Sequence, residues 1–560
     1  MFSKIKNNLI NQSLNSPIRT LIISILCTLF IFWGFKNFKV DDDLVKTFPQ
    51  NMESKLIWDD IQEEFGQTEF IFVAFGKPGH NILNDKWAIA QSQFFTDAIL
   101  SEISDKVDKV ISLSTYNKID GNNDFLDIGL LQDEDFIKNF SNDAITLKSL
   151  DYIRTYLNDN PEQKKRLISS NNDYLNIAIR PIDDSSFSEI VLQVKDLADQ
   201  HLGDYDIHFA GQPYLAGETP GLIKKDVSTL MLIGIIIMFI ILFLNLRSLY
   251  AVLIIILTIL CSFLAMLGFM GWMRYLTGSN YFDFTMMNTS MPIILLTIAN
   301  SDGVHVITKF FRELRDLGEV HLAVASAMRS LLTPIFLTSI TTIAAFLTMI
   351  TSPLDPLIGY GVCISIGILW AWLLSSFMLP AVIGLLYWDQ QSKAIATPSF
   401  LEKFIENTSR IIISYPRYVF SFGLAMILVG VFGLNKINID VNVASFFKPG
   451  TEIRDSMDFM DTEMSGTMDL RILVDGDIKD PSILKKIDSL QTFIRGVSHI
   501  NVAYSIVDVV KQMHRAVMDD DAKFETIPDD RQKINNLFTM YSISGSHDDF
   551  SRMVDHDYTS

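Results

Sequence analysis

The sequence of 560 residues is poor in cysteine and in basic residues. Its three cysteines, Cys27, Cys261 and Cys363, each lie inside an apolar run, so neither a disulfide framework nor a cysteine-based zinc site is expected. Lys and Arg total 46 against 65 Asp and Glu, and the net charge of −19 argues against a nucleic-acid partner, which needs a basic face. A glycine-rich loop followed by Lys and Ser or Thr is missing, as is a nucleophile paired with a base. We therefore expect neither ATP as the energy source nor an enzyme.

Apolar residues, in contrast, are abundant. Hydrophobic residues make up 49% of the chain, with 40 Phe and a mean hydropathy of +0.25, while 20% of the residues are charged. This mixture predicts membrane spans combined with large acidic soluble parts. A helix needs about 20 mostly apolar residues to cross the hydrocarbon core. Seven stretches qualify, at about residues 18–35, 227–246, 251–273, 285–308, 332–350, 358–386 and 418–434.

The basic residues near the span ends predict the orientation of the chain. The first stretch follows a basic start and lacks a small-residue cleavage site, which indicates an uncleaved signal anchor. Lys and Arg gather at alternate ends of the spans, and the short loops near 274–284 and 351–357 contain only Arg274. We therefore expect a multi-pass membrane protein with a cytoplasmic N-terminus and large domains on the outer side.

This reading divides the chain into six parts. They are the cytoplasmic N-terminus and first span (1–36), a first external α+β domain (37–226), a five-span bundle (227–386), a cytoplasmic linker (387–417), the seventh span (418–434) and a second external domain (435–560), which we expect to be truncated.

An internal repeat relates the two external domains at an offset of 400 residues. Pro49 matches Pro449, Gly66 matches Gly466, and the strand-like segment 69–73 matches 469–473. The chain ends where the second half of the repeated domain would begin, which leaves a sheet half built. The sequence is therefore interpreted as a fragment of a longer duplicated protein.

Both external domains show a strand–helix–strand order. In the first domain we expect a strand at 69–73, a helix at 84–105 and a strand at 107–113, then a polar helical insert, then a strand at 174–180, a helix at 186–201 and a strand at 206–210. In the second we expect a strand at 468–474, a helix at 480–496, a strand at 500–505 and a polar insert. The expected fold is an α-helical membrane bundle of seven spans, in a duplicated pattern of one plus five and then one, with α+β ferredoxin-like external domains.

One acidic residue stands out inside the predicted spans. Asp302 is the only acid, and His305 the only histidine, in all seven stretches. A carboxylate at the centre of a span costs about 2.5–3.5 kcal/mol on insertion scales, so it usually faces a bundle interior or a water path. The two residues lie about 60° apart on a helix, and a carboxylate beside an imidazole can take and release protons near neutral pH. We predict that Asp302 and His305 form a proton relay.

An alternative is that this span ends near Ala299 and that Asp302 merely meets water. Residues 285–299 would cross only about 22 Å of a core about 30 Å thick, which favours the longer span. Supporting polar groups are expected from Asn300, Ser301, Thr338, Thr341 and Thr342, although threonine in membrane helices often bonds to its own backbone.

Several short motifs at the span ends carry a family resemblance. The motifs are Gly211-Gln212-Pro213, Leu246-Arg247-Ser248-Leu249, Asp302-Gly303-Val304-His305, Lys309-Phe310-Phe311-Arg312-Glu313 and Ser352-Pro353-Leu354-Asp355-Pro356. With these motifs in this order, the chain resembles the resistance–nodulation–division (RND) superfamily of proton-driven transporters, and within it the MMPL and sterol-sensing-domain-like exporters. The resemblance implies a proton-coupled export role without a cofactor, in the bacterial inner (plasma) membrane with periplasmic or other extracytoplasmic domains.

The favoured function is a proton-motive-force-driven exporter of hydrophobic or amphiphilic molecules such as lipids or drugs. Its partners would be membrane lipids, the lipid-like substrate, and periplasmic or outer-membrane proteins. Two alternatives stay open: a non-transporting sterol-sensing-type sensor or scaffold, and an accessory protein of Sec-type protein export. A sensor needs no buried acid, so Asp302 separates the first reading from the second.

Overall fold

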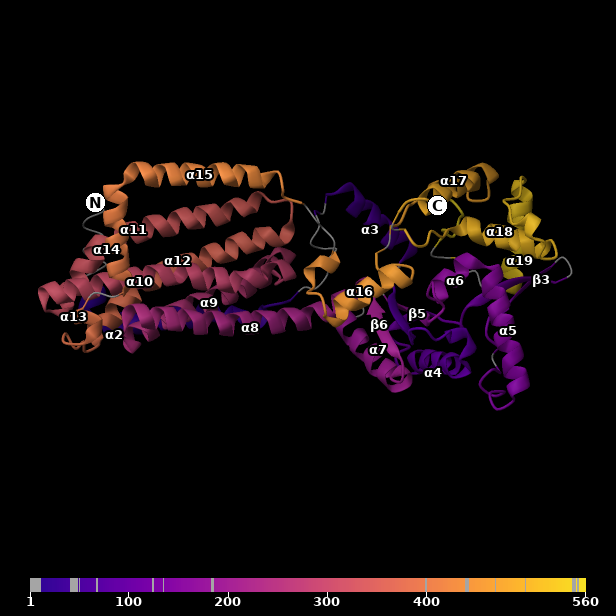
Figure 1. The fold of residues 1–560 in the computed structure, drawn as a ribbon, viewed down its shortest axis with the longest axis horizontal. Coiled ribbons are helices and arrows are strands. Elements are labelled where there is room, and N and C mark those ends of the chain that lie inside the picture. Colours follow the sequence, from indigo (N-terminus) through magenta and orange to yellow (C-terminus); the bar gives the residue numbers. More distant parts are fainter. Residues whose placement is uncertain are drawn as a thin grey trace. The chain divides into compact units, whose positions relative to one another are not determined.

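A computed structural model gives the three-dimensional arrangement of the chain as two compact units (Figure 1). The membrane unit comprises Met1–Gln50 and Thr219–Ile439, and the α/β unit comprises Asn51–Glu218 and Asp440–Ser560. The structure describes residues 12–40, 49, 51–66, 69–122, 125–133, 135–182, 186–397, 400–438, 443–468, 470–498, 500–545, 550 and 553–560.

Seven helices of the described chain are long and apolar enough to span a membrane, and each coincides with one predicted stretch. They run side by side in the membrane unit (Figure 1). The helices are α2 (Pro17–Phe32), α8 (Gln212–Leu246), α9 (Leu249–Thr277), α10 (Met291–Leu317), α11 (Val320–Leu347), α12 (Asp355–Leu385) and α15 (Pro416–Leu434).

Three of these helices extend well beyond the predicted ends. The helix α8 begins at Gln212 instead of residue 227, α11 begins at Val320 instead of 332, and α10 continues to Leu317 instead of ending at 308. Hydropathy marks only the apolar length of a helix, whereas backbone hydrogen bonds continue through polar turns. In α10 the added turns carry an ion pair between Lys309 Nζ and Glu313 Oε1 at 2.7 Å.

The helices α9, α10 and α12 form the centre of the membrane unit, because they bury at least half of their most apolar window. Close packing there depends on small residues. A Cβ atom on Gly268 of α9 would lie 2.2 Å from the carbonyl oxygen of Ile31 in α2, so only glycine permits this approach. The helix α15, which follows the amphipathic α14 (Phe400–Ser414), buries none of its residues.

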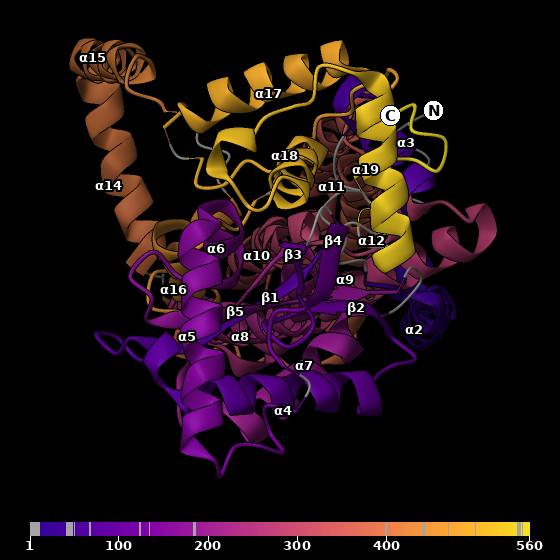
Figure 2. The ribbon, with the colours of Figure 1, turned by 90° about the vertical axis from the view of Figure 1, so that its right-hand side faces the viewer.

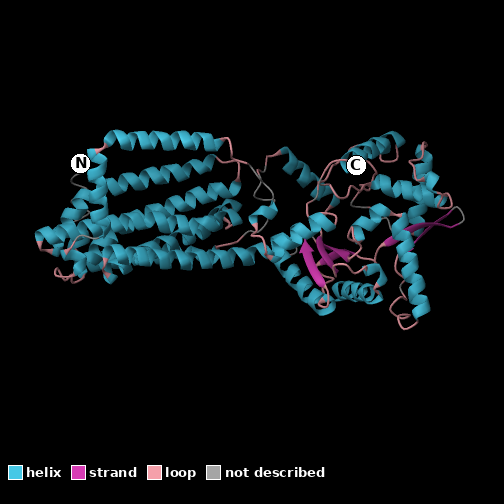
Figure 3. Cartoon of the chain, in the orientation of Figure 1, coloured by secondary structure: helices cyan, strands magenta, loops and turns pink. Residues whose placement is uncertain are grey.

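The α/β unit is built around a four-stranded antiparallel sheet (Figures 2 and 3). Its strand order is β2-β5-β1-β6, and the register places Phe72 opposite Ala178 and Ala74 opposite Asn176. All six predicted elements that surround the insert of this region are confirmed. They are β1 (Ile71–Gly76), α4 (Lys86–Glu102), β2 (Val107–Ile111), β5 (Tyr174–Pro181), α7 (Phe187–Leu202) and β6 (Asp206–Ala210).

The two faces of this sheet are covered differently. The fully buried side chains of Ile71, Val73 and Phe75 alternate with Phe72 and Ala74, so they belong to the face on which α4 and α7 pack (Figure 2). On the opposite face α16 (Glu452–Glu463) covers the β6 edge, where Met460 and Met464 contact Ala74, Tyr174 and Ala210. Neither α4 nor α7 covers the rest of that second face.

The segment between β2 and β5, which the sequence predicts to be helical, starts instead with a hairpin. Its strands are β3 (Asn117–Asn122) and β4 (Phe125–Leu130), and the predicted helical character appears only afterwards, in α5 (Asp143–Asp159) and α6 (Pro161–Leu167). The hairpin packs on helices of the second half of the chain: Ile119 and Leu126 share a core with Met513 and Phe538.

The second half of the α/β unit contains the predicted helix but not the predicted strands. The helix at 480–496 is confirmed as α17 (Pro481–Arg495). The described residues of 468–474 and all of 500–505 have no strand assignment, so these two predictions are wrong; residue 469 lies outside the described chain. Neither segment has a ladder of backbone bonds to a neighbour, which a strand requires.

The region beyond residue 506, a polar insert by sequence, is well packed. It forms α18 (Ile506–Val517) and α19 (Arg531–Ser544). In the first half of the unit, a further helix, α3 (Glu53–Phe65), precedes β1. Ser505 caps α18, and its backbone N–H donates to Asp508 Oδ2 in a capping box.

Candidate functional site

Asp302 lies in the middle of a continuous helix, which does not end near Ala299. The helix α10 runs from Met291 to Leu317, which places Asp302 about 16 Å from its start and about 22 Å from its end at 1.5 Å per residue. Gly318, with φ of 69°, ends α10, and its N–H donates to the carbonyl of Leu314 at 3.0 Å. A two-residue connection then leads directly into α11, so the two helices are neighbours.

The carboxylate of Asp302 is buried and contacts α11. Its side chain is 8% exposed, and the hydroxyl of Ser339 donates to its Oδ2 at 3.3 Å. Within the described chain this is the one hydrogen bond or ion pair of the Asp302 side chain. The next residue, Gly303, faces α9, where a Cβ would meet Ile255 at 3.1 Å. Asp302 is therefore a buried acid on the side of α10 that faces α11, next to a glycine that allows close approach of α9.

The structure does not bring the other predicted relay residue to this carboxylate. His305 lies one turn further along α10 and its side chain is exposed. No hydrogen bond or ion pair joins it to Asp302 in the part of the chain that is described. The supporting residues on α10 are also outside the contact: Ser301 is exposed, and Asn300 is half-buried with an Oδ1 atom that has no partner among the described residues.

The predicted threonines of α11 bond to their own helix. Thr338 donates to the carbonyl of Ile335 at 3.0 Å, Thr341 to that of Leu337 at 2.9 Å, and Thr342 to that of Thr338 at 2.7 Å. Satisfied in this way, the hydroxyls are not directed at Asp302. The hydroxyl of α11 that bonds to Asp302 is therefore that of Ser339, which was not among the predicted supporting residues.

A signal for Ser339 was present in the sequence. The buried residues Met328, Leu332 and Ile335 of α11 recur at spacings of four and three, and Ser339 continues the same stripe. A polar residue on the buried stripe of a membrane helix faces the bundle interior. Two further residues that were missed, Ser375 and Ser376, are buried in α12, and their hydroxyls have no partner within the described residues.

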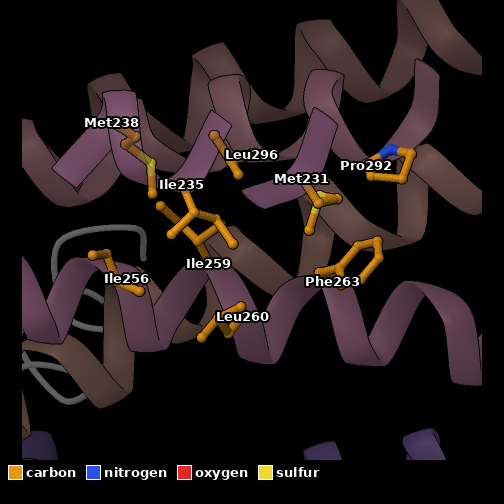
Figure 4. A pocket seen from close by; sticks show the side chains of 9 residues that line it. All are labelled: Met231, Ile235, Met238, Ile256, Ile259, Leu260, Phe263, Pro292 and Leu296. Atoms are coloured by element: carbon orange, nitrogen blue, oxygen red, sulfur yellow. The ribbon is translucent and has the colours of Figure 1, made fainter. Parts of the chain in front are cut away.

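The membrane unit also contains a small apolar cavity between α8, α9 and α10 (Figure 4). Its volume is about 10 Å³, which is near the minimum for a single water molecule. Its lining is entirely apolar, so it offers neither room nor polar groups for a substrate. The residues are Met231, Ile235, Met238, Ile256, Ile259, Leu260, Phe263, Pro292 and Leu296.

Residues 52–396 match the MMPL family, over more than half of the chain. The chain belongs to the MMPL family. The matched range includes α8 to α12 and therefore both Asp302 and Ser339. Members of the MMPL family are membrane transporters of the RND type rather than enzymes.

A relative supports the membrane assignment of this MMPL protein. A protein of Methanocaldococcus jannaschii, described by its name as a membrane protein, is 22% identical over 398 residues, which cover 68% of this chain and 94% of the relative. Together with the seven span-length helices, this similarity identifies the MMPL protein as a multi-pass membrane protein. No group of three or more His, Cys, Asp or Glu residues that could hold a metal ion occurs in the described ranges.

Proposed function

We propose that this MMPL protein is a proton-motive-force-driven exporter of hydrophobic or amphiphilic molecules such as lipids or drugs. One observation supports the proposal above all: the buried carboxylate of Asp302 touches a second helix through Ser339. A charged side chain at this depth is unfavourable by about 2.5–3.5 kcal/mol, and a functional site is the default interpretation of such a residue. The driving force is the proton gradient, and no cofactor is required.

The coupling follows from the contact between α10 and α11. When Asp302 is ionised, it accepts the hydrogen bond of Ser339; when a proton binds to the carboxylate, the charge that favours this bond is lost. The proton arrives from one side of the membrane and leaves to the other, so no covalent bond of the protein changes overall. Each protonation step thereby alters the free energy of the contact between two spans, which is what a two-state transporter needs.

The surrounding architecture fits this role. We propose that the α/β unit is extracytoplasmic and contains a ferredoxin-like domain, with the strand order β2-β5-β1-β6 as support. We also propose a bacterial inner membrane and a cytoplasmic N-terminus, from the bias of Lys and Arg at the span ends. Reporters fused after Gln391 and after Asp480 should then lie on opposite sides of the membrane; the same side for both would contradict this orientation. Membrane lipids, the substrate and periplasmic or outer-membrane proteins are the proposed partners.

Asp302→Asn provides the test, because asparagine keeps the size of the side chain and removes its titratable charge. The complete duplicated protein that is expected to contain this chain, reconstituted in liposomes with an imposed pH gradient, should show proton flux and export of a fluorescent amphiphile. We expect both to fall to background in Asp302→Asn at normal abundance, and to be partly retained in Asp302→Glu. His305→Ala should have a milder effect, because His305 is exposed and no hydrogen bond joins it to the carboxylate among the described residues.

Asp316→Asn is the matched control, since Asp316 is an exposed acid near the end of the same helix. It should transport like the parent. If Asp302→Asn also transports like the parent, Asp302 is not the relay. If the parent itself shows no flux, the sensor or scaffold reading replaces the exporter.

A further inference from the structure

The α/β unit contains a large cavity on the face of the sheet that α4 and α7 leave uncovered. Its volume is about 1040 Å³, at the upper end of the usual range of about 300–1,000 Å³ for ligand pockets. One wall consists of β1, β5 and β2, with Phe72, Asn176 and Ala178 pointing to the cavity. The opposite wall consists of α17, the segments 470–474 and 500–505, which form no strand, and Ile506 at the start of α18.

The charge of the lining is opposite to that of the chain. Among the described lining residues four side chains are cationic, Lys109, Arg166, Arg180 and Arg471, and one is acidic, Asp461. The carboxylate of Asp461 already accepts hydrogen bonds from the backbone and side chain of Thr467, at 2.9 and 2.8 Å. In a chain with a net charge of −19, this concentration of cations favours an anionic ligand.

Arg166 is the cation best placed to hold an anion. Arg180 forms an ion pair with Asp108 at 2.5 Å, and Arg471 lies over the ring of Trp58 at 5.1 Å. Arg166 stacks on the ring of Tyr504 at 4.5 Å, and no carboxylate of the described chain forms an ion pair with it. The stacking fixes the guanidinium plane at the cavity wall, where its N–H groups match the oxygens of a phosphate or carboxylate.

Asn176 supplies a second, independent indication of a ligand. It is 4% exposed, lines the cavity, and donates from its amide nitrogen to the carbonyl of Arg166 at 2.9 Å. Because this bond fixes the amide orientation, its Oδ1 atom is an acceptor that has no partner among the described residues. A buried acceptor without a donor is unfavourable, so this atom suits a ligand hydroxyl beside the anionic group.

The remaining lining is apolar enough for an acyl chain. Phe65, Phe70 and Phe72 line one side, and Leu470 and Ile472 line the other. Leu470 is 78% exposed and Ile472 49% exposed, which is unusual for side chains on the inner wall of a folded unit. An apolar chain in the cavity would cover both of them.

We infer that this cavity binds a glycerophospholipid with one acyl chain. Its phosphate contacts Arg166, its free glycerol hydroxyl donates to Asn176 Oδ1, and its acyl chain lies along the phenylalanines. The claim that the protein moves this ligand rests on the proposed function, whereas the binding itself does not.

The inference is tested with the full chain in phosphatidylcholine nanodiscs, titrated with 1-oleoyl-glycerol 3-phosphate and corrected for empty nanodiscs. Two comparison ligands separate the contacts: monooleoylglycerol lacks the phosphate, and the 2-O-methyl ether lacks the donating hydroxyl. We expect the phosphate ligand to bind about tenfold more tightly than either one, as for the loss of a charged or buried hydrogen bond. Equal affinity for the three ligands would overturn the inference.

Substitutions of single residues then test whether the cationic lining residues account for the affinity for the phosphate ligand. Arg166→Gln should weaken binding of the phosphate ligand about tenfold and leave monooleoylglycerol within twofold, while Arg166→Lys should retain part of the preference. Lys109→Gln provides a second test that does not disturb Tyr504, with about a threefold loss expected. Arg531→Gln on α19, outside the cavity, is the matched control and should bind like the parent. Unchanged affinity in both Arg166→Gln and Lys109→Gln would contradict the inference.

Asp302→Asn distinguishes this inference from the proposed function. It should bind the phosphate ligand like the parent, because Asp302 belongs to the membrane unit. If proton flux depends on Asp302 but the ligand does not bind, only the cavity assignment fails. If the ligand binds and the parent shows no proton flux, only the exporter proposal fails.

Discussion

The two units of this MMPL protein bury polar side chains in different ways. In the membrane unit the carboxylate of Asp302 has one hydrogen bond, from Ser339 at 3.3 Å. In the α/β unit, Gln512 of α18 donates to the hydroxyl of Tyr156 at 2.8 Å and accepts from Gln163 at 3.0 Å. Asp302 is thus an acid with a single partner among the described residues, whereas Gln512 belongs to a network of hydrogen bonds.

The network of the α/β unit contains further hydrogen bonds to the same buried groups. Asn160 Oδ1 accepts from Gln512 at 3.3 Å and from Arg515 at 2.8 Å, and the Tyr156 hydroxyl also accepts from the backbone of Ile119 at 3.1 Å. Burial raises the pKa of Tyr156 to about 12, so the hydroxyl stays protonated at neutral pH. Polar groups satisfied in this way stabilise one arrangement of the helices, whereas a poorly satisfied acid in a membrane span indicates function. We therefore expect substitutions in the network of the α/β unit to lower stability, and substitutions around Asp302 in the membrane unit to lower transport.

Gln512→Leu should give the largest change in local stability. The substitution removes the acceptor of the buried Gln163 amide and one of the two donors to the Tyr156 hydroxyl, at about 1–3 kcal/mol. Hydrogen exchange followed by mass spectrometry should therefore become faster in α18 and in the hairpin β3–β4. Gln532→Leu, an exposed position of α19, is the control and should exchange like the parent. Unchanged exchange in Gln512→Leu would mean that the network contributes no stability.

The spans could be predicted from the sequence because hydropathy is a local property. Each of the seven stretches contains one helix, but the helix ends were missed where polar turns continue the backbone bonds, as at Gln212 and Val320. A strand, in contrast, is formed with a partner that lies far away in sequence. Segment 69–73 contributes to β1 because β5 and β6 pair with it, more than 100 residues later.

The repeat at an offset of 400 residues also shows that a local sequence pattern predicts local structure but not strand pairing. The helices α3 and α16 occupy equivalent positions, and Gly66 and Gly466, which follow them, both have positive φ values of 66° and 102°. Local structure is thus repeated. The strand-like segment that follows is not, because residues 470–474 have no ladder partner among the described residues. Similar sequence alone does not form a sheet.

The candidate site was half predictable. A lone acid in an apolar helix identified Asp302 directly. Its partner on α11 required the period of the buried residues, which passes through Ile335 and Ser339 and leaves Thr338 outside. His305 was assigned to the relay as the only histidine of the predicted spans, three residues from Asp302; its side chain is exposed, and no hydrogen bond joins it to Asp302 among the described residues.

Ser339→Ala should reduce proton-driven transport about three- to tenfold without loss of protein. The variant removes a hydrogen bond of about 0.5–1.5 kcal/mol from Asp302, and a change of 1.4 kcal/mol corresponds to a factor of ten. Initial rates in proteoliposomes measure the effect, with Ser330→Ala as the control, because the Ser330 hydroxyl bonds only to the Ala327 carbonyl of its own helix among the described residues. A parental rate in Ser339→Ala would remove Ser339 from the coupling mechanism.

Thr338→Val should have the smallest effect, although Thr338 is adjacent to Ser339. Valine has nearly the shape of threonine, and the hydroxyl that it lacks donates to the carbonyl of Ile335 in the same helix. That carbonyl can keep its regular backbone bond, so the substitution should change stability by less than about 0.5 kcal/mol and the transport rate by less than about twofold. Parallel measurement of initial rates and melting temperature for Thr338→Val and Ser339→Ala checks this. The helical period alone separates the two residues, so equal losses in both variants would show that the buried stripe of α11 does not select the partner of Asp302.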